Sequence, residues 1–261
     1  MCLLVLAWRM HPRYSLVVAA NRDEYHERPA APLAHWAAPP HILAGRDLRA
    51  GGTWLGLDRR RRFGVVTNFR ELQRPLPGAA SRGELIPRFL AAESAPEEFF
   101  AALEPQAAAY SGFNLLLAGQ ESLWYGCNRA TPFARALPPG IYGLSNELLD
   151  TPWPKLERVR SGFREWLRAE AADSAALFTL LADRTRVSDA RLLPRTGLTR
   201  NWERVLSSPF VQDAAYGTRS STVVLLQPDG RVLLRERRFD SDGTRSGETE
   251  FALNPGEWPD A

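Results

Sequence analysis

Cys2, the residue that follows the initiator methionine, has a side chain and a position that suit nucleophilic catalysis. If Met1 is removed, a thiol and a free α-amine belong to the same residue. A thiolate is a strong nucleophile, and an α-amine has a pKa of about 7.7–8.0, close to neutral pH. One residue can then supply both the attacking group and its base, as in N-terminal nucleophiles. The alternative is that Cys2 is an inert residue that begins a buried strand over residues 3–8.

A cluster of four polar residues, 21–24, follows the strand-like run 15–20. Arg22 can lower the pKa of a nearby thiol through its positive charge. Asp23 can accept a hydrogen bond from an α-ammonium group or orient Arg22. Because adjacent residues of a strand face opposite ways, Arg22 and Asp23 reach one pocket only if the chain turns there. Glu24 is the alternative second site residue, and the cluster can also be a capped turn.

Three residues further along the chain can complete such a site. Asn68 and Asn146 each follow a strand-like run, and their side-chain amides are candidate donors for an oxyanion hole. Arg219 directly precedes the polar run 220–222, and its side chain can reach the same place. The candidate catalytic residues are therefore Cys2, Arg22, Asp23, Asn68, Asn146 and Arg219.

The composition is that of an ordinary globular protein. A chain of 261 residues with 44% hydrophobic and 24% charged residues can bury a large core. The net charge is +3, and Lys155 is the only lysine, so nearly all the positive charge is arginine. The basic run 59–62 lies between two strand-like runs and predicts a charged hairpin turn. No second basic cluster accompanies it, so no nucleic-acid partner is expected.

Several other classes of protein are disfavoured. The four histidines lack the spacing of metal ligands, and the glycine pair 51–52 precedes a strand rather than a helix, so neither a metal nor another cofactor is expected. Two cysteines do not make a disulfide scaffold. The N-terminal apolar run is too short for a transmembrane helix and lacks the basic flank of a signal peptide. These features predict a cytoplasmic protein without stable membrane insertion.

Hairpins that alternate with helix pairs are predicted to position the candidate residues. Capping boxes that begin at Ser81 and Ser94 predict helices over 85–92 and 96–103. Apolar residues at helical spacing from Leu156 to Leu167 predict an amphipathic helix that begins near Pro154, with a short partner over 174–182. The segment 28–40, rich in Pro and Ala, is expected to be a loop. Strands are expected at 3–8, 15–20, 53–57, 63–67, 113–118, 122–125, 221–226, 232–238 and 249–253.

These elements predict an α+β fold, because hairpins imply antiparallel sheets. The order of elements permits the two helix pairs to cover opposite faces of two stacked sheets. No linker or internal repeat divides the chain, so residues 1–261 are expected to form a single domain.

The chain resembles the NRDE family, the transport and Golgi organisation protein 2-like proteins. The resemblance runs along the whole chain in ordered short motifs, among them the sequence AANRDEY at residues 19–25. The motifs that carry it are residues 1–2, 19–25, 28–29, 51–56, 67–68, 82–85, 112–115, 142–146, 151–153, 217–219 and 250–253.

The resemblance implies the fold of the Ntn hydrolases, a four-layer αββα sandwich of antiparallel sheets. The candidate residues are similar to the set of the choloylglycine hydrolase and penicillin V acylase branch. That branch uses an N-terminal Cys, an Arg and an Asp on the next hairpin, amide donors and a later Arg. One departure is that the first Arg and the Asp lie a few residues apart in that branch, whereas Arg22 and Asp23 are adjacent here.

Two functions follow from these residues and this resemblance. The first is an N-terminal-cysteine hydrolase of a linear amide or a related acyl compound. The alternative is a non-catalytic binding or trafficking protein on the same fold, with haem or an acyl-lipid or acyl-CoA as its ligand. In either case the expected partner is a small amphipathic molecule.

Overall fold

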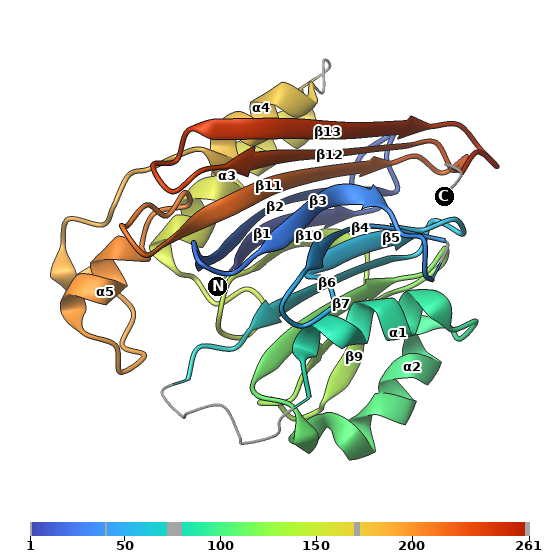
Figure 1. Cartoon of the computed structure of the whole chain (residues 1–261), viewed down its shortest axis with the longest axis horizontal. Coiled ribbons are helices and arrows are strands. Elements are labelled where there is room, and N and C mark those ends of the chain that lie inside the picture. Colours follow the sequence, from blue (N-terminus) through green and yellow to red (C-terminus); the bar gives the residue numbers. More distant parts are fainter. Residues whose placement is uncertain (1, 40, 72–79, 170–172, 259–261) are drawn as a thin grey trace. The chain divides into compact units, whose positions relative to one another are not determined.

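The computed structural model describes residues 2–39, 41–71, 80–169 and 173–258, and it divides the chain into two compact units. The first unit comprises Met1–Glu27, Arg70–Leu72 and Pro139–Ala252. The second comprises Arg28–Phe69, Gln73–Pro138 and Leu253–Ala261. Each unit contains one sheet and its own helices (Figure 1).

The sheet of the first unit has six strands in the order β10-β1-β2-β11-β12-β13. β2 pairs antiparallel with β1 on one side and with β11 on the other, so residues far apart in the sequence meet in the middle of this sheet. The strands are β1 (Cys2–Trp8), β2 (Leu16–Tyr25), β10 (Gly140–Leu144), β11 (Tyr216–Leu226), β12 (Val232–Phe239) and β13 (Arg245–Leu253).

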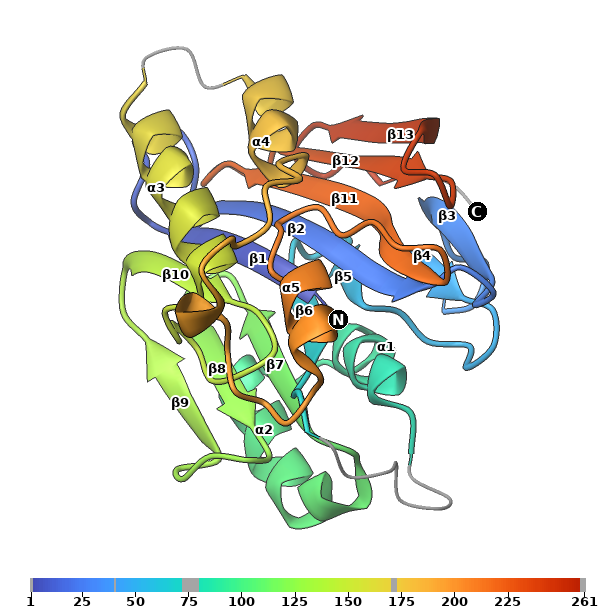
Figure 2. The same ribbon diagram turned by 90° about the vertical axis from the view of Figure 1, so that its left-hand side faces the viewer.

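Two helices, α3 (Pro154–Arg168) and α4 (Ser174–Leu181), pack on this sheet. Figure 2 shows them side by side over β1, β2 and β11. Proline at the first position of α3 suits a helix start, because its missing N–H has no intrahelical partner there. The apolar positions predicted from the spacing of residues 156–167 are all buried against the sheet. A short helix, α5 (Arg200–Val205), lies in the otherwise irregular segment before β11.

The sheet of the second unit has seven strands in the order β3-β4-β5-β6-β7-β8-β9, with every neighbouring pair antiparallel. The run 59–62 makes the predicted turn between β5 and β6. Arg62 is nonetheless buried, pairs with Asp58 at 2.7 Å and donates to the carbonyl oxygens of Leu90 and Ala92. The strands are β3 (Ala30–His35), β4 (Ile42–Asp47), β5 (Leu55–Asp58), β6 (Phe63–Asn68), β7 (Phe113–Ala118), β8 (Leu123–Cys127) and β9 (Ala134–Leu137).

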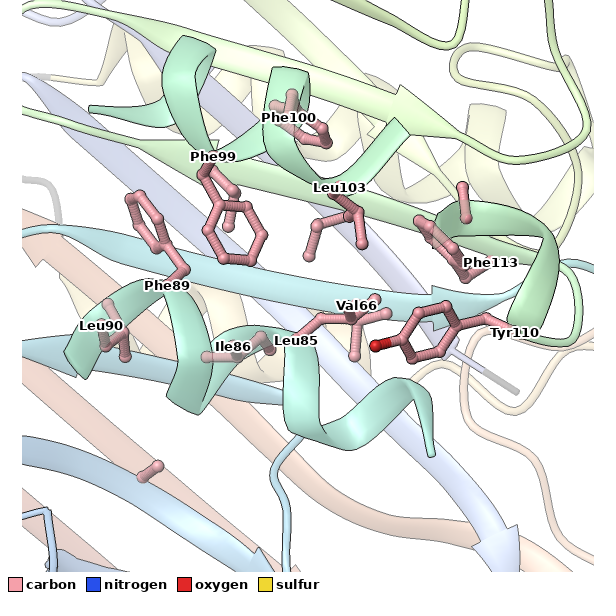
Figure 3. Close-up of a cluster of buried hydrophobic side chains, with 14 of the residues drawn as sticks. Val66, Leu85, Ile86, Phe89, Leu90, Phe99, Phe100, Leu103, Tyr110 and Phe113 are labelled. Carbon is pink, nitrogen blue, oxygen red and sulfur yellow. The ribbon is translucent and has the colours of Figure 1, made fainter. Parts of the chain in front are cut away.

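The helices α1 (Leu85–Ala91) and α2 (Pro96–Leu103) cover the second sheet through an aromatic-rich core. Figure 3 shows Phe89, Phe99 and Phe113 of this core together with Val66 of β6. The predicted capping box at Ser81 is only partly right. The Ser81 hydroxyl accepts from the Gly83 N–H and caps a 3-10 turn, Arg82–Glu84, that directly precedes α1. The Glu84 carboxylate accepts from the Tyr110 hydroxyl. The predicted bounds of the second helix, 96–103, are confirmed, but its capping box is displaced by one residue. The Glu98 carboxylate, not Glu97, accepts from the N–H of the helix cap, which is residue 95.

The predicted fold class, α+β with antiparallel sheets, is confirmed, and two predictions about individual segments need correction. Part of the expected loop 28–40 is the edge strand β3. The strands β4 and β9 were not expected from the sequence, whereas β10 is the strand-like run before Asn146. Within the described residues, no helix is both long enough and apolar enough to cross a membrane.

Candidate active site

The ends of three neighbouring strands bring the first candidate residues together in the first unit. Cys2 begins β1 and lies opposite Arg22 of β2 in the antiparallel register. Directly opposed residues share one face of a sheet, so these two side chains lie on the same side. β10 pairs with β1 on its other edge, with Leu144 opposite Leu4, and Asn146 follows the end of β10 by two residues. The Ser145 hydroxyl donates to the Cys2 carbonyl oxygen at 3.0 Å.

Arg22 and Asp23 face opposite sides of the sheet. β2 continues through Tyr25, so the chain does not turn between them. The buried odd-numbered residues of β1 and β2 pack against α3 and α4, and by alternation Asp23 faces the same, helix-covered side. Arg22 therefore shares a face with Cys2. Glu24, the alternative residue, is half-buried on that same face.

Burial controls the acidity of the Cys2 thiol. Desolvation raises its pKa above the usual value, and the Asp23 carboxylate raises it further. The Arg22 charge and a hydrogen bond from the Asp23 backbone N–H lower the pKa, but burial outweighs them. Arg22 therefore lowers the pKa of the thiol, as predicted, but by less than burial raises it. At neutral pH the thiol is protonated, so it needs a base before it can attack a carbonyl.

We expect iodoacetamide to modify Cys2 in the folded protein while Cys127 stays protected. Cys127 is 0% exposed in β8, whereas Cys2 is partly exposed at the beginning of its strand. Because the Cys2 pKa is raised, the labelling rate of the form that retains Met1 should still increase above pH 9. Peptide mass spectrometry after timed labelling measures both thiols in one sample. Equal labelling of the two cysteines in the folded protein would contradict the greater exposure of Cys2.

Asp23 is a buried residue whose carboxylate and backbone carbonyl each accept a hydrogen bond from a hydroxyl group of β11. Its Oδ1 atom accepts from the Thr218 hydroxyl at 2.7 Å, and its backbone carbonyl accepts from the Tyr216 hydroxyl at 2.7 Å. Burial raises the pKa of Asp23, whereas the nearby Lys155 ammonium group lowers it. Burial and the Asp23 charge also raise the pKa of Tyr216 well above its usual value. The β2–β11 pairing thus fixes Asp23 on the side of the sheet that the helices cover.

Arg219 lies at an irregularity of β11. The register with β2 shifts between Thr218 and Ser220, so Arg219 is the extra residue of a β-bulge. Its guanidinium donates to the carbonyl oxygens of Tyr25 and His26, at 3.1 and 2.8 Å. Burial lowers the pKa of Arg219, and the Arg22 charge contributes in the same direction. These contacts hold Arg219 at the end of β2.

Two further asparagines of the sequence motifs, Asn68 and Asn21, lie in different surroundings. Asn68 belongs to the second unit, where it ends β6 and lies opposite Phe113 of β7. Asn21, a member of the polar cluster at residues 21–24, has a structural role in the first unit. Its amide group donates to the carbonyl oxygens of Leu181 and Pro209, both at 2.9 Å, so it joins β2 to the end of α4.

A buried ion pair that the sequence analysis missed lies in the same unit. Arg70 and Glu203 are 2.7 Å apart, and their side chains are 6% and 1% exposed. The Arg70 guanidinium lies over the Trp153 ring at 4.5 Å from its centroid. Glu203 also accepts a hydrogen bond from the Thr196 hydroxyl at 2.5 Å. The pair joins α5, the start of α3 and the segment after β6.

Lys155 is a third residue of this unit that was not predicted from the sequence. It is the chain's only lysine, it belongs to the first turn of α3, and it is 2% exposed. Burial lowers its pKa to about 8, while Asp23 is the first of the neighbours that oppose this change. Lys155, Arg70 and Glu203 line a cavity of about 10 Å³ in the first unit. In the sequence Lys155 stands out only as the single lysine, and this does not predict where it lies in the fold.

The residues that the structure describes contain no group of three or more His, Cys, Asp or Glu side chains arranged to hold a metal ion. The groups of this unit that can take part in chemistry include the thiol of Cys2 and the charges of Arg22, Asp23 and Lys155.

Comparisons with known proteins agree with this description. The chain is 34% identical to the mouse Transport and Golgi organization 2 homolog over 97% of this chain and 99% of the relative, and 33% identical to the human homolog with the same coverage. Its structure is similar to the C2A mutant of conjugated bile acid hydrolase from Clostridium perfringens, with a TM-score of 0.53, 8% identity and coverage of 97% and 92%. This likeness confirms the Ntn-hydrolase fold. The sequence model of Transport and Golgi organisation 2 matches residues 1–241, and the chain belongs to this family.

Proposed function

We propose that the protein is an N-terminal-cysteine hydrolase that cleaves a linear amide or a related acyl compound. The observation that carries the proposal is the position of Cys2 at the beginning of β1, with Arg22 opposite it on β2 and Asn146 two residues beyond the end of the other neighbouring strand, β10. The fold supports the proposal, because a structural neighbour over almost the whole chain is named as a hydrolase of conjugated bile acids.

In the proposed reaction the α-amine of Cys2, freed by removal of Met1, takes the proton of the thiol. The sulfur then attacks the carbonyl carbon of the amide, and the electron pair of the C=O bond moves to oxygen. The Asn146 amide donates to this oxyanion. When the C=O bond re-forms, the C–N bond breaks, the amine leaves with the proton, and a thioester remains on Cys2. Water hydrolyses the thioester, releases the carboxylic acid and restores the thiol.

We expect Cys2→Ala to abolish turnover of N-acyl amides and thioesters, because no other nucleophile is assigned to the site. Asn146→Ala should lower kcat by about 10²–10³ if its amide serves the oxyanion. Cys2→Ser keeps the α-amine and a weaker nucleophile, so partial activity is expected. Intact mass establishes that Met1 is absent from the sample, and a screen of N-acyl amides and thioesters then measures turnover.

Cys127→Ala is the matched control, because it removes the other thiol from β8 of the second unit. It should retain activity if it folds, which circular dichroism checks. Turnover by folded Cys2→Ala would end the nucleophile proposal.

The second candidate is a binding or trafficking protein for haem or an acyl-lipid or acyl-CoA ligand. Two observations favour it: the Cys2 thiol is protonated at neutral pH, and Arg219 is bonded to the backbone of residues 25 and 26. For a carrier, Cys2→Ala should leave ligand affinity nearly unchanged, and no substrate in the screen should turn over. The small amphipathic partner, the absence of a nucleic-acid partner and the cytoplasmic location remain predictions from the sequence.

A further inference from the structure

Lys155 occupies a position that is unfavourable for a cation in three respects. Its side chain is 98% removed from solvent, and desolvation of an ammonium group is costly. It belongs to the first turn of α3, where the helix dipole already presents partial positive charge. Its Nζ atom has no hydrogen-bond partner among the residues that the structure describes. Because the chain's only lysine lies in this unfavourable position, we expect either an interaction that compensates the cost of burying its charge or a function for it.

The compensation comes from Asp23. Four other ionisable groups act on Lys155: Asp23 of β2, Arg70, Cys2 of β1 and Glu203 of α5. Asp23 is the largest of the charges that favour the ammonium form, and Lys155 is in turn the largest of the charges that favour the Asp23 carboxylate. The Glu203 charge is already paired with Arg70 at 2.7 Å. Asp23 and Lys155 are therefore each other's main electrostatic partner within this unit.

Asp23 also connects this pair to Cys2. Its backbone N–H donates to the Cys2 sulfur, and its carboxylate acts on the thiol through its charge. The hydroxyl of Thr218 holds the carboxylate, and that of Tyr216 holds the backbone carbonyl, each at 2.7 Å. A change in the charge of Asp23 is thus transmitted to Cys2 without movement of the strands.

We propose that Lys155 is a positioning residue of the Cys2 site, and that its ammonium group favours the carboxylate form of the buried Asp23 side chain. The use of that carboxylate, which is to accept a hydrogen bond from the freed α-ammonium group of Cys2, rests on the proposed hydrolase function. The effect of the Lys155 charge on Asp23 does not depend on that function. Burial already raises the pKa of Asp23 in the presence of Lys155, and loss of the ammonium group raises it further.

The titration of Lys155 can be followed directly, because selective ¹³C labelling of lysine gives a single residue's signals. We expect Lys155 to titrate near pH 8 rather than near its usual value of 10.5. Asp23→Asn removes the charge that favours the ammonium form, so it should move this titration to lower pH. An ordinary lysine titration in the wild type, or no change in Asp23→Asn, would overturn the pairing.

The titration of Asp23 provides the second test. With aspartate labelled at its carboxyl carbon, the signal absent from Asp23→Asn identifies Asp23. Lys155→Met should move the Asp23 titration to higher pH, whereas Lys155→Arg keeps a positive charge and should restore most of the wild-type behaviour. Arg158→Met removes a different cation from the same helix and should leave Asp23 unchanged. A merely structural lysine would give the same Asp23 titration in Lys155→Met as in the wild type, and this result would reject the proposal.

The catalytic consequence is tested separately. If the protein turns over a substrate, the acid limb of the pH–rate profile should move to higher pH in Lys155→Met and return in Lys155→Arg. If turnover is absent in every form, the hydrolase proposal fails while the two titrations still decide the role of Lys155. If turnover is present and its acid limb does not move in Lys155→Met, the positioning role fails and the hydrolase proposal stands.

Discussion

Glu203→Ala is expected to lower the free energy of unfolding by about 3–5 kcal/mol, because it leaves Arg70 as a buried charge without its carboxylate. Glu203 lies 2.7 Å from Arg70, and both side chains are almost completely buried. Burial already lowers the pKa of Arg70, and the Glu203 charge is the first of the groups that oppose this change. Loss of Glu203 also removes the acceptor for the Thr196 hydroxyl.

Urea unfolding followed by circular dichroism measures this change. The matched control is Glu93→Ala, which breaks an ion pair of the same length, 2.7 Å, between Arg60 and Glu93. Those side chains are 43% and 85% exposed, so the control should change stability by no more than about 0.5 kcal/mol. Similar small effects for both variants would show that the Arg70 charge is solvated after the substitution. The buried ion pair would then contribute little to the free energy of unfolding.

Lys155→Met is expected to stabilise the protein by about 3 kcal/mol at pH 7. A lysine pKa lowered from 10.5 to about 8 means that folding opposes the ammonium form by this amount, with the attraction of Asp23 already included. Methionine has a similar length and no charge to desolvate. Below pH 8 the full penalty is present in the wild type. Between about pH 8 and 10.5 the folded protein releases the lysine proton before the unfolded chain does, so the penalty disappears as the pH rises.

The measurement is the difference in unfolding free energy between wild type and Lys155→Met at several pH values. Because Cys2 and Tyr216 titrate in both proteins, their contributions cancel to first order in this difference. It should fall from about 3 kcal/mol at pH 7 to near zero above pH 10.5. Arg158→Met, on the exposed side of the same helix, should show no such dependence. A destabilised Lys155→Met protein at pH 7 would mean that the Asp23 attraction exceeds the cost of burial.

Local patterns explain which elements could be predicted from the sequence. The stripe from Leu156 to Leu167 predicts α3 correctly, because a helix repeats its buried face every three to four residues. β3 was missed because Pro32 and its alanine neighbours are weak strand formers. Proline is tolerated in this strand because β3 is at the edge of its sheet, where one side needs no ladder hydrogen bonds. Whether a strand lies at the edge or in the middle of a sheet depends on distant strands, so a local sequence pattern does not predict it.

The site could be predicted only in part for the same reason. The placement of Cys2 opposite Arg22 follows from one hairpin, which short-range reasoning can find. The side that Asp23 faces depends on how far β2 continues, and that is fixed by its pairing with β11. Arg70 and Glu203 are 133 residues apart in the sequence, and each looks there like an ordinary surface charge. The burial of Lys155 likewise results from the packing of α3 on the sheet. Asn68, in the other unit, remains a sequence-based candidate.

The central position of β2 also determines when the site can form during protein synthesis. Thr218 of β11, which holds Asp23, is 195 residues further along the chain. At a ribosomal rate of about 5–20 residues per second, about 10–40 s separate the appearance of these two residues. During that interval the first hairpin exists without its neighbour, and the buried face of β2 needs protection from aggregation. Asp23 accordingly gains its hydroxyl partner only when β11 joins the sheet.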